Sequence, residues 1–385
     1  MIIGVPKEIM TGEARVAATP ETVKKFVADG MTVLVQTGAG VKSRYDDEQY
    51  REAGAQMISQ PQQLFEQADL ILKVKEPLFN EALNKHEVDL MHAGQYLITF
   101  IHPASPVNHE MVKKLAAKGV TAMTLDSIPR ISRAQNMDAL TSMSTCAGYK
   151  GILMAANDLT VFMPQLFTAV GVIKPANVLV IGAGVAGLQA LATAKRIGAV
   201  TYAMDIRPAA AEQAMSLGAK IIETGIPEEL AVGKGGYALK LPEPWLVKER
   251  ELLSEVLKEM DIVFCSALIP GKIAPVLITE EMVQSMKNGS VIVDVSIDQG
   301  GNCALTVPGK KEIFHNVMIQ GIKNIPGLIP TSSTWMFSQN VYNLVSHLVK
   351  DSKIELDLDD VITRDILVTR NNQIVHEGAR ESMGL

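Results

Sequence analysis

The feature that most constrains the fold of this chain is a glycine-rich segment that follows a short apolar run. The run Val178–Ile181 leads directly into Gly182, and Gly184 and Gly187 follow. In this spacing the first glycine permits a tight turn, the second lets the backbone approach a pyrophosphate, and the third lets a helix pack closely on the strand. The helix N-terminus then offers free N–H groups and a positive dipole end to an anion. The segment predicts a dinucleotide-binding βαβ unit.

The residue that ends the next predicted strand indicates which dinucleotide binds. Asp205 follows an apolar run after the predicted helix, where a carboxylate can accept both hydroxyls of the adenosine ribose. It would repel a 2′-phosphate by about 4 kcal/mol at about 4 Å if the effective dielectric constant is ~20. Arg207 could receive a phosphate, but Asp205 lies at the strand end, so NAD(H) is expected in preference to NADP(H). The alternative is a glycine-rich strand–helix turn that binds no ligand.

The rest of the chain repeats this alternation of short β-rich runs and longer helix-patterned stretches. Such alternation indicates βαβ units and parallel sheets, and 385 residues suffice for two or three domains. We expect an α/β protein with two Rossmann-like lobes that contain parallel sheets and are joined by long interlobe helices. Residues 1–139 and 327–385 should form a discontinuous N-terminal lobe, and residues 140–326 the NAD(H)-binding Rossmann domain.

Two series of strands are predicted, one for each lobe. The first series is Ile2–Val5, Val33–Gln36, Leu70–Val74, Tyr96–Phe100 and Thr121–Leu125. The second series is Asn177–Ile181, Thr201–Asp205, Lys220–Ile222, Asp261–Cys265, Ser290–Val295 and Val317–Gln320. Six strands are the number in a full dinucleotide-binding sheet.

Helix signals lie between these strands. Thr19 is expected to cap a helix that has Pro20 at its first position. Gly119 is expected to close a second helix over Val107–Lys118. A long helix should begin at about Leu140.

The C-terminal region carries further signals. A helix is predicted over Trp335–Val349, which would return the chain to the first lobe, and a hairpin that turns at Asn371 and Asn372. The segment Thr224–Trp245 is rich in glycine and proline and shows no clear period. Connections of this length inside a compact domain tend to be functional or mobile.

Composition excludes several classes of function. The chain has 36 basic and 42 acidic residues, a net charge of −6, which argues against a protein built to bind nucleic acid. Cys146, Cys265 and Cys303 are widely separated, so we expect neither a disulfide framework nor a metal site, and a reducing compartment. The sequence contains no uninterrupted run of 18 or more apolar residues, so no membrane span is expected. The N-terminus does not resemble a signal peptide.

Several further motifs resemble one family. They are Pro129–Asp138 (PRISRAQNMD), Ala147-Gly148-Tyr149, Gly235–Ala238 (GGYA), Ala267–Lys272 (ALIPGK) and Gly300–Cys303 (GGNC). With them, nearly the whole chain resembles the alanine dehydrogenase/transhydrogenase superfamily. Within it, the chain is most similar to the NAD(H)-binding component of proton-translocating NAD(P) transhydrogenase, which is domain I, the first portion of the alpha subunit.

The resemblance implies roles for particular residues. Arg130, Gln135 and Asp138 would be the catalytic residues at the nicotinamide and its ribose, with Gln135 bridging toward a second nucleotide. Thr141 stands where the family often has serine, and Gly235–Ala238 matches a mobile loop that closes over the nucleotide. The expected cofactor-binding residues are Arg130, Ile131, Ser132, Arg133, Gln135, Asp138, Thr141, Gly182, Gly184, Val185, Gly187, Asp205, Ile206, Arg207, Gly236, Tyr237 and Leu268.

The resemblance also implies a reaction and an assembly. The chain would pass hydride, with Re/Si specificity, between its own NAD(H) and NADP(H) on a partner chain. NADP(H)-binding and membrane-spanning subunits would be its partners, within a homodimer on the inner face of the cytoplasmic membrane. Hydride transfer between two nicotinamides moves no proton, so a loop with amide, guanidinium and carboxylate groups suits a task of positioning. Without the resemblance, Arg130–Asp138 could equally be a structural loop.

Two other functions stay open. Arg15, Lys75, His102 and Asp298 match the positions with which alanine dehydrogenases bind a carboxylate and transfer protons, so NAD-dependent deamination of L-alanine to pyruvate is the alternative. Against it, the proline- and glutamate-containing segment that those enzymes have before the long helix is absent here. A third hypothesis is a non-catalytic NAD sensor, against which the long segment Thr224–Trp245 argues, since closing loops exclude water from reacting sites.

Overall fold

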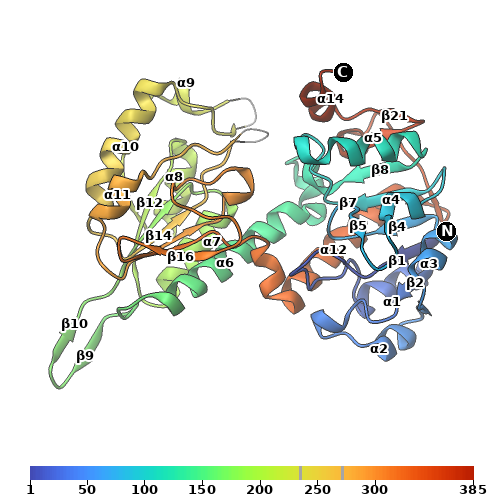
Figure 1. Ribbon diagram of the computed structural model, residues 1–385, viewed down its shortest axis with the longest axis horizontal. Helices are drawn as coiled ribbons and strands as arrows, with labels where there is room; N and C mark the ends of the chain where they lie inside the picture. Colours follow the sequence, from blue (N-terminus) through green and yellow to red (C-terminus); the bar gives the residue numbers. More distant parts are fainter. Residues whose placement is uncertain (234–235, 270–272) are drawn as a thin grey trace. The chain divides into compact units, whose positions relative to one another are not determined.

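The computed structural model describes residues 1–233, 236–269 and 273–385 (Figure 1). They divide into two units by their contacts: unit 1 comprises Met1–Met143 and Gly327–Leu385, and unit 2 comprises Ser144–Pro326. The division falls inside helix α6 (Ala139–Asp158), so the predicted boundary at 139/140 lies at the start of a continuous helix. In the described ranges, no helix is long and apolar enough to span a bilayer.

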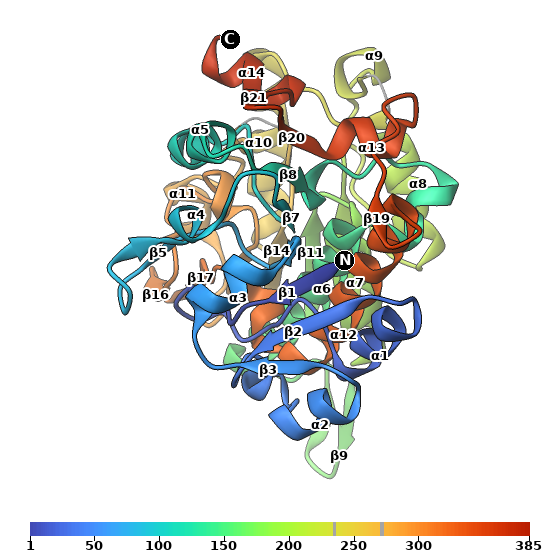
Figure 2. The ribbon, with the colours of Figure 1, turned by 90° about the vertical axis from the view of Figure 1, so that its right-hand side faces the viewer.

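Unit 1 is built on a sheet that the described residues form with eight strands. In spatial order these are β21 (Gln373–Ile374), β20 (Leu367–Arg370), β8 (Thr121–Thr124), β7 (Tyr96–Thr99), β4 (Leu70–Leu72), β1 (Ile2–Val5), β2 (Thr32–Gln36) and β3 (Gln56–Ile58). The strands from β8 to β3 are parallel, and β20 and β21 add an antiparallel edge. Neighbouring strands can be followed in Figure 2. The first predicted series is confirmed, but β3 was missed because it is a short, partly exposed edge strand.

Helices and short hairpins complete unit 1. The helices are α1 (Pro20–Ala28), α2 (Asp47–Glu52), α3 (Pro61–Gln67), α4 (Glu87–Leu90), α5 (His109–Ala117), α12 (Pro330–Leu348), α13 (Val361–Ile366) and α14 (Glu377–Met383). The small hairpins pair β5 (Phe79–Asn80) with β6 (Lys85–His86), and β18 (Val349–Lys350) with β19 (Lys353–Ile354). Apolar side chains of α3, α4 and α5, including Leu64, Val88 and Leu115, share one core with the sheet strands.

The predicted N-cap is present, whereas the second predicted helix ends earlier than expected, with Lys118 and not Gly119 at the C-cap of α5. Thr19 caps α1 in a capping box, with Pro20 in the first turn. After the short helix η7 (Ile325–Leu328), the chain is again in unit 1, and α12 lies wholly there. The Phe26 ring of α1 lies 5.2 Å from the Tyr342 ring of α12, so the two helices pack together. The C-terminal hairpin turns at Asn371 and Asn372, both with positive φ as a two-residue turn requires.

Unit 2 is built on a sheet that the described residues form with seven strands. In spatial order these are β13 (Lys220–Ile221), β12 (Val200–Met204), β11 (Asn177–Ile181), β14 (Ile262–Cys265), β15 (Val291–Asp294), β17 (Val317–Gln320) and β16 (Lys311–Phe314). The six parallel strands are the predicted ones, and they follow the 3-2-1-4-5-6 order of dinucleotide-binding sheets. The prediction of six strands was one short, since β16 adds an antiparallel edge whose exposed side chains give it no apolar run.

Helices cover both faces of this sheet. Helices α6, α7 (Val185–Arg196) and α8 (Pro208–Ser216) share a core with one face, through residues such as Ala155, Ala190 and Ala214. Helices α10 (Glu243–Leu257) and α11 (Glu280–Ser285) cover the other face, through residues such as Leu253 and Val283. The doubly wound α/β architecture that the sequence predicts is therefore present in unit 2.

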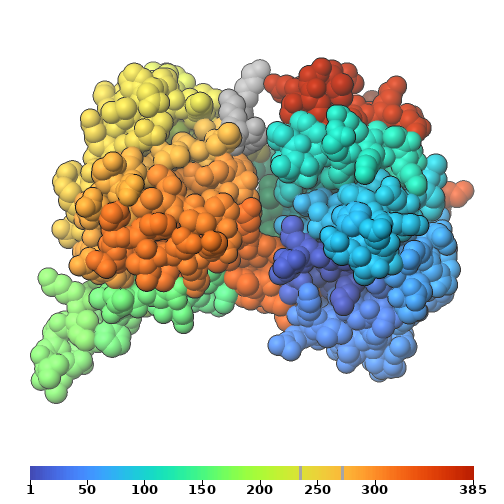
Figure 3. Space-filling model, in the orientation of Figure 1, coloured from blue at the N-terminus to red at the C-terminus, as the bar shows by residue number. Residues whose placement is uncertain are grey.

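Two segments of unit 2 differ from the expected pattern. The segment Thr224–Trp245 shows no clear period in the sequence, yet it contains α9 (Glu228–Ala231) and the first residues of α10. A hairpin of β9 (Leu166–Thr168) and β10 (Gly171–Ile173) was not predicted, and it projects from the rest of unit 2 (Figure 3). Its side chains are unusually exposed for apolar residues, at 79% for Phe167 and 97% for Val170.

Candidate functional site

Two of the three glycines after β11 are required by close packing of the backbone. Gly182 has φ of +89°, and a Cβ added there would lie 2.7 Å from the amide nitrogen of Ala267. A Cβ on Gly187 would lie 2.1 Å from the carbonyl oxygen of Gly182. Gly184 is different, because a Cβ there would meet nothing within 4 Å. Protein atoms therefore pack closely against Gly182 and Gly187, whereas the space beside Gly184 is open.

Helix α7 begins directly at this open position. Gly184 occupies its N-cap and supplies no side-chain hydrogen bond to the first turn. The first N–H groups of a helix have no partner within the helix, and here they adjoin the open space at Gly184. An extended anionic group fits this arrangement, since it would accept from these N–H groups at the positive end of the helix dipole.

Asp205 lies beside the same turn, at the carboxyl end of β12. Its buried carboxylate accepts a 2.8 Å hydrogen bond from the backbone N–H of Ala183, which ties β12 to the glycine turn. It also accepts from Arg207 through the backbone N–H, Nε and Nη2, at 2.8, 3.0 and 2.8 Å. This hydrogen bonding raises the pKa of the Arg207 guanidinium. In the sequence, Asp205 and Arg207 favoured different cofactors, whereas the structure joins them in one ion pair.

A second carboxyl group lies near Asp205 and was not anticipated. Glu249 on α10 is buried, one helical turn before Leu253, which packs in the same core cluster as Met204 of β12. Burial, with a smaller contribution from the Asp205 carboxylate, raises the pKa of Glu249 to about 7. The sequence alone gives little reason to single out Glu249, because it is one of several charged residues in α10.

The backbone of Ala267, which packs against Gly182, is held in place by the side chain of Asn302. Its Oδ1 accepts from the Ala267 N–H at 3.0 Å, and its Nδ2 donates to the carbonyls of Ala267 and Pro275, both at 2.9 Å. Asn302 is fully buried, and its backbone N–H donates to the Asp294 carboxylate at 2.8 Å. Ser266 adds a 2.7 Å hydrogen bond from its hydroxyl to the Gly182 carbonyl. A chain of contacts therefore runs from Asp294 to the glycine turn.

The segment Thr224–Trp245 packs beside the end of β12. Ile226, Ala231 and Leu241 form a small core against which Ile206 packs, next to Asp205. The segment folds back on itself, with a hydrogen bond of 2.8 Å from Gly233 N–H to the Tyr237 carbonyl. Of the family motifs expected here, Gly236, Tyr237 and Leu268 are described, and Gly236 has φ of +76°. Gly235 and the segment Pro270–Lys272 lie outside the described residues.

The expected catalytic residues lie in unit 1, around the short helix η4 (Ser132–Met137). Ala134 and Met137 are buried and anchor η4, whereas Arg130 and Gln135 are exposed. Ile131, at the N-cap of η4, and the first residues, Ser132 and Arg133, complete the predicted group. Asp138 acts as a cap for α6, since its carboxylate accepts from the Thr141 N–H at 2.8 Å and from the Thr141 hydroxyl at 2.6 Å.

The four residues of the alternative constellation are placed differently. Arg15 is buried and bound by Glu13 through two hydrogen bonds, Nε to Oε1 at 2.8 Å and Nη2 to Oε2 at 2.6 Å. Asp298 belongs to unit 2, where its side chain is 64% exposed and pairs with Lys323 at 3.7 Å. Arg15 therefore already has a carboxylate partner.

His102 and Lys75 follow the carboxyl ends of β7 and β4, respectively. The His102 Nδ1 lies 2.7 Å from the Asp126 carboxylate, and His102 has φ of +49°, which is rare for a residue other than glycine. Burial alone would lower the pKa of His102, but the adjacent Asp126 carboxylate outweighs it and the pKa is raised. Solvent screens this pair, since the imidazole is 45% exposed.

Comparison with protein families identifies the chain. The model described as "Alanine dehydrogenase/PNT, N-terminal domain" matches residues 4–147, and the one described as "Alanine dehydrogenase/PNT, C-terminal domain" matches residues 151–377. The chain belongs to the alanine dehydrogenase/PNT family. The resemblance inferred from the motifs is confirmed.

The relatives of this chain include transhydrogenase subunits and alanine dehydrogenases. The chain is 43% identical over 379 residues to the first portion of NAD(P) transhydrogenase subunit alpha from Rhodospirillum rubrum, with 98% of each chain covered. It is 32% identical over 394 residues to alanine dehydrogenase of Bacillus subtilis, covering 100% of this chain and 95% of the other. The crystal structure of transhydrogenase from Sinorhizobium meliloti superposes with a TM-score of 0.85 at 36% identity, covering 97% of this chain and 100% of that one.

In this member of the alanine dehydrogenase/PNT family, unit 1 also has a buried ionic cluster that was not expected from the sequence. Lys73 is fully buried and lies 3.2 Å from the Glu8 carboxylate and 3.1 Å from the Glu87 carboxylate. Glu8 also accepts from the Val74 N–H at 2.6 Å, and Glu87 from the Leu78 N–H at 2.9 Å. The sequence feature that could have indicated this cluster is the position of Lys73, a charged residue directly after the buried strand β4.

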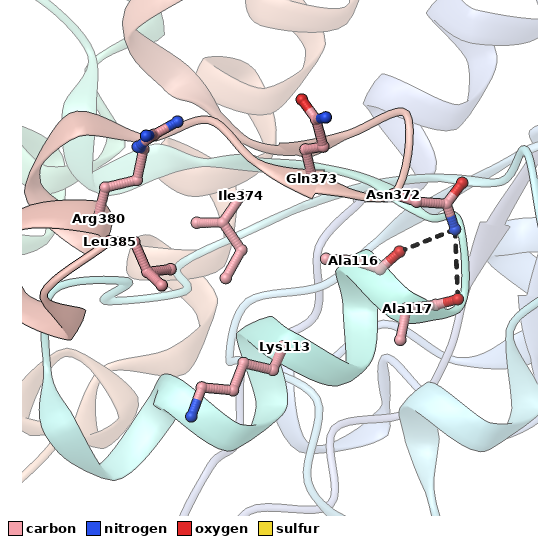
Figure 4. Close-up of a pocket in the computed structure, with 8 residues that line it drawn as sticks. All are labelled: Lys113, Ala116, Ala117, Asn372, Gln373, Ile374, Arg380 and Leu385. Carbon is pink, nitrogen blue, oxygen red and sulfur yellow. Dashed lines mark hydrogen bonds between the residues drawn. The ribbon is translucent and has the colours of Figure 1, made fainter.

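A surface hollow of about 470 Å³ on unit 1 contains none of the predicted site residues (Figure 4). It lies between α5, β21 and the C-terminal residues, with Lys113, Arg380 and Leu385 around it. Asn372 donates to the carbonyls of Ala116 and Ala117 at its edge, which closes the C-terminal end of α5. Over the described ranges of the chain, no three His, Cys, Asp or Glu side chains are grouped to hold a metal ion, and the three cysteines are buried and form no disulfide.

Proposed function

We propose that this chain is the NAD(H)-binding component of a proton-translocating transhydrogenase. It would pass hydride between NAD(H) on this chain and NADP(H) on a partner chain, with the Re/Si specificity of that enzyme class. The observation that carries the proposal is the 43% identity, over 98% of both chains, to the first portion of a transhydrogenase alpha subunit. The geometry supports it, because Arg15, the carboxylate anchor of the alternative, is already bound by Glu13.

The residues of unit 2 fit a dinucleotide by their packing. The α7 N-terminus and the open space at Gly184 would hold the pyrophosphate, with Gly182, Val185 and Gly187 around it. Asp205, Ile206 and Arg207 would hold the adenosine half, and Gly236, Tyr237 and Leu268 would line the rest of the pocket. When bound, NAD(H) supplies the hydride carrier. Hydride transfer from one dihydronicotinamide to another nicotinamide requires no proton from the protein, so the chain contributes orientation and exclusion of water.

For unit 1 we propose the roles that the family resemblance implies. Arg130, Gln135 and Asp138 would contact the nicotinamide and its ribose, and Gln135 would face the second nucleotide. Ile131, Ser132, Arg133 and Thr141 would complete this region of the cofactor site. The exposed positions of Arg130 and Gln135 support the proposal, since both can reach a ligand without leaving a core.

Alanine dehydrogenation is the second candidate, and one observation favours it. His102 and Asp126 form a close pair, and His102 follows the carboxyl end of a parallel strand, where ligands of open α/β sheets bind. A histidine with a carboxylate partner is suited to the proton transfers of amino-acid oxidation.

The two candidates are separated by assaying the purified chain, first alone with alanine and NAD⁺, then with its NADP(H)-binding partner. We expect no pyruvate from the chain alone and hydride transfer once the partner is added. His102→Ala should leave transfer within about 2-fold of wild type, and Gln135→Asn should slow it by roughly 10²-fold, because a displacement of about 1 Å has that effect. Alanine oxidation that His102→Ala abolishes would establish the second candidate instead.

Cofactor preference gives a second test. We expect the isolated chain to bind NADH at least about 10-fold more tightly than NADPH, since the Asp205 carboxylate repels a 2′-phosphate. Asp205→Asn should narrow the difference, because it removes the negative charge and frees Arg207 to contact a phosphate. Fluorescence titration with both nucleotides measures this. Equal wild-type affinities would contradict the role of Asp205.

We further propose a homodimer that associates with NADP(H)-binding and membrane-spanning subunits, peripherally on the inner face of the cytoplasmic membrane. The exposed apolar side chains of the β9–β10 hairpin support contact with a second chain, since Phe167 and Val170 have little cover in their own chain. Sedimentation analysis of the purified chain should give twice the monomer mass, and a monomer would contradict the proposal.

A further inference from the structure

Two asparagines of α12 hold the backbone of η4 at one peptide carbonyl. The Asn136 carbonyl oxygen accepts from Asn340 Nδ2 at 2.9 Å and from Asn343 Nδ2 at 3.0 Å. A carbonyl oxygen has two lone pairs, so these two donors saturate it. This carbonyl belongs to the peptide that joins Asn136 to Met137, so the two hydrogen bonds fix the backbone one residue after Gln135.

One side of this contact lies against the core of unit 1. Asn340 is 7% exposed, and Ala134 and Met137 of η4 are buried, whereas Asn136 between them is exposed. Asn340 Oδ1 is buried and makes no hydrogen bond within the described chain, so the amide is oriented by its donor alone. A buried amide that leaves its own oxygen unpaired incurs a desolvation penalty, which indicates that the Asn136 contact determines its position.

A second anchor holds the other end of η4. Arg133 forms an ion pair with the Asp360 carboxylate, which also accepts from His347 Nε2 at 2.8 Å and caps α13 through Thr363. His347 lies on α12, one turn beyond Asn343. Residues from α12 and α13 therefore hold η4 on both sides of Gln135, while the Gln135 side chain stays exposed.

We propose that Asn340 and Asn343 are positioning residues for hydride transfer, which act by orienting Gln135 through the Asn136 carbonyl. The inference rests on the proposed transhydrogenase function and deepens it. In this role α12 contributes to hydride transfer without binding the nucleotide. Without the two donors the peptide after Asn136 can rotate, and the side chain of Gln135 is no longer held in one orientation. Because reaction rates depend steeply on the placement of reacting groups, the rate of transfer should fall much more than NADH affinity.

The test uses the double variant Asn340→Asp/Asn343→Asp in the chain reconstituted with its NADP(H)-binding partner. The substitution preserves side-chain size but places acceptors where the Asn136 carbonyl needs donors. Gln339→Glu is the matched control, since it makes the same amide-to-carboxylate change on α12, at a residue that contacts Lys25 and Glu21 instead of η4. The readouts are NADH affinity, the transfer rate at saturating nucleotides, the isotope effect with C4-deuterated NADH, and the melting temperature.

We expect the double variant to bind NADH within about 2-fold of wild type, to transfer hydride about 10²-fold more slowly, and to show an isotope effect at least as large as wild type. Gln339→Glu should transfer at the wild-type rate. If the double variant does not fold, Asn343→Asp at its half-buried position replaces it. An unchanged rate, an equal loss of rate and affinity, or an equally slow control would overturn the inference. Failure of the wild-type chain to transfer hydride would instead overturn the proposed function.

Discussion

Gly187→Ala should destabilise unit 2 and abolish NADH binding. The added methyl group would lie 2.1 Å from the Gly182 carbonyl oxygen, a backbone atom that cannot move without displacing the turn. Overpacking of a core usually lowers the free energy of unfolding by about 1–3 kcal/mol, and a collision with backbone at this distance should reach or exceed the upper end. Denaturant unfolding and NADH titration measure the two effects.

Gly184→Ala is the matched control for this prediction. A Cβ at Gly184 meets nothing within 4 Å, and φ at Gly184 is −77°, so the variant should fold with wild-type stability. It should still weaken NADH binding, because the methyl group occupies the space proposed for the pyrophosphate. A Gly187→Ala protein with wild-type stability would show that helix α7 does not need the close approach to Gly182.

Lys73→Met should destabilise unit 1 strongly. The substitution removes the cation that lies between two carboxylates, Glu8 and Glu87, which are 6% and 2% exposed. Breaking a buried ion pair by removing one partner lowers stability by about 3–5 kcal/mol, because the remaining charge is left uncompensated. Lys113→Met is the control, since its pair with Glu110 is exposed and screened by solvent, so its loss should leave the stability close to that of wild type. Denaturant unfolding of both variants measures the difference.

The same cluster predicts how the stability of the variant depends on pH. In the wild type, burial raises the pKa of Glu8 even though Lys73 lowers it. A raised carboxyl pKa contributes stability below the ordinary pKa of glutamate, and this contribution is lost as the pH rises through the raised value. Without Lys73 the pKa of Glu8 should rise further, so the stability gap between Lys73→Met and wild type should widen from acidic to neutral pH. A gap independent of pH would contradict the role of charge.

The strands were predictable because burial on both faces leaves a continuous apolar run in the sequence. All strands of the two predicted series appear, with ends that shift by one or two residues, such as β4, predicted as Leu70–Val74 and observed as Leu70–Leu72. Among the missed strands, β3 and β16 are partly exposed edge strands without such a run, and β5, β6, β18 and β19 are two-residue strands of short hairpins. The side chains of the β9–β10 hairpin are apolar but exposed. Apolar residues usually indicate burial, so the sequence did not indicate an exposed hairpin here.

The candidate site was predictable only where its residues are close in the chain. Gly182, Gly184 and Gly187 serve one turn, and their spacing alone describes it. Asp205 and Arg207 are two residues apart, yet their ion pair depends on side-chain directions that the sequence does not specify. Asn302 could not be assigned, because its partners Ala267 and Pro275 lie in other segments that meet only after β14 and β15 pair.

The sequence by itself determined the two α/β lobes, the glycine turn and the family to which the chain belongs, because each follows from local periodicity or from residues adjacent in the chain. Only the tertiary structure decided that Glu13 binds Arg15 with both carboxylate oxygens, that Lys73 joins Glu8 to Glu87, and that α12 holds η4 through Asn136. The last of these contacts joins residues about two hundred positions apart. Hydrogen bonds and ion pairs act over a few ångströms, so such partners are defined only when the chain has folded.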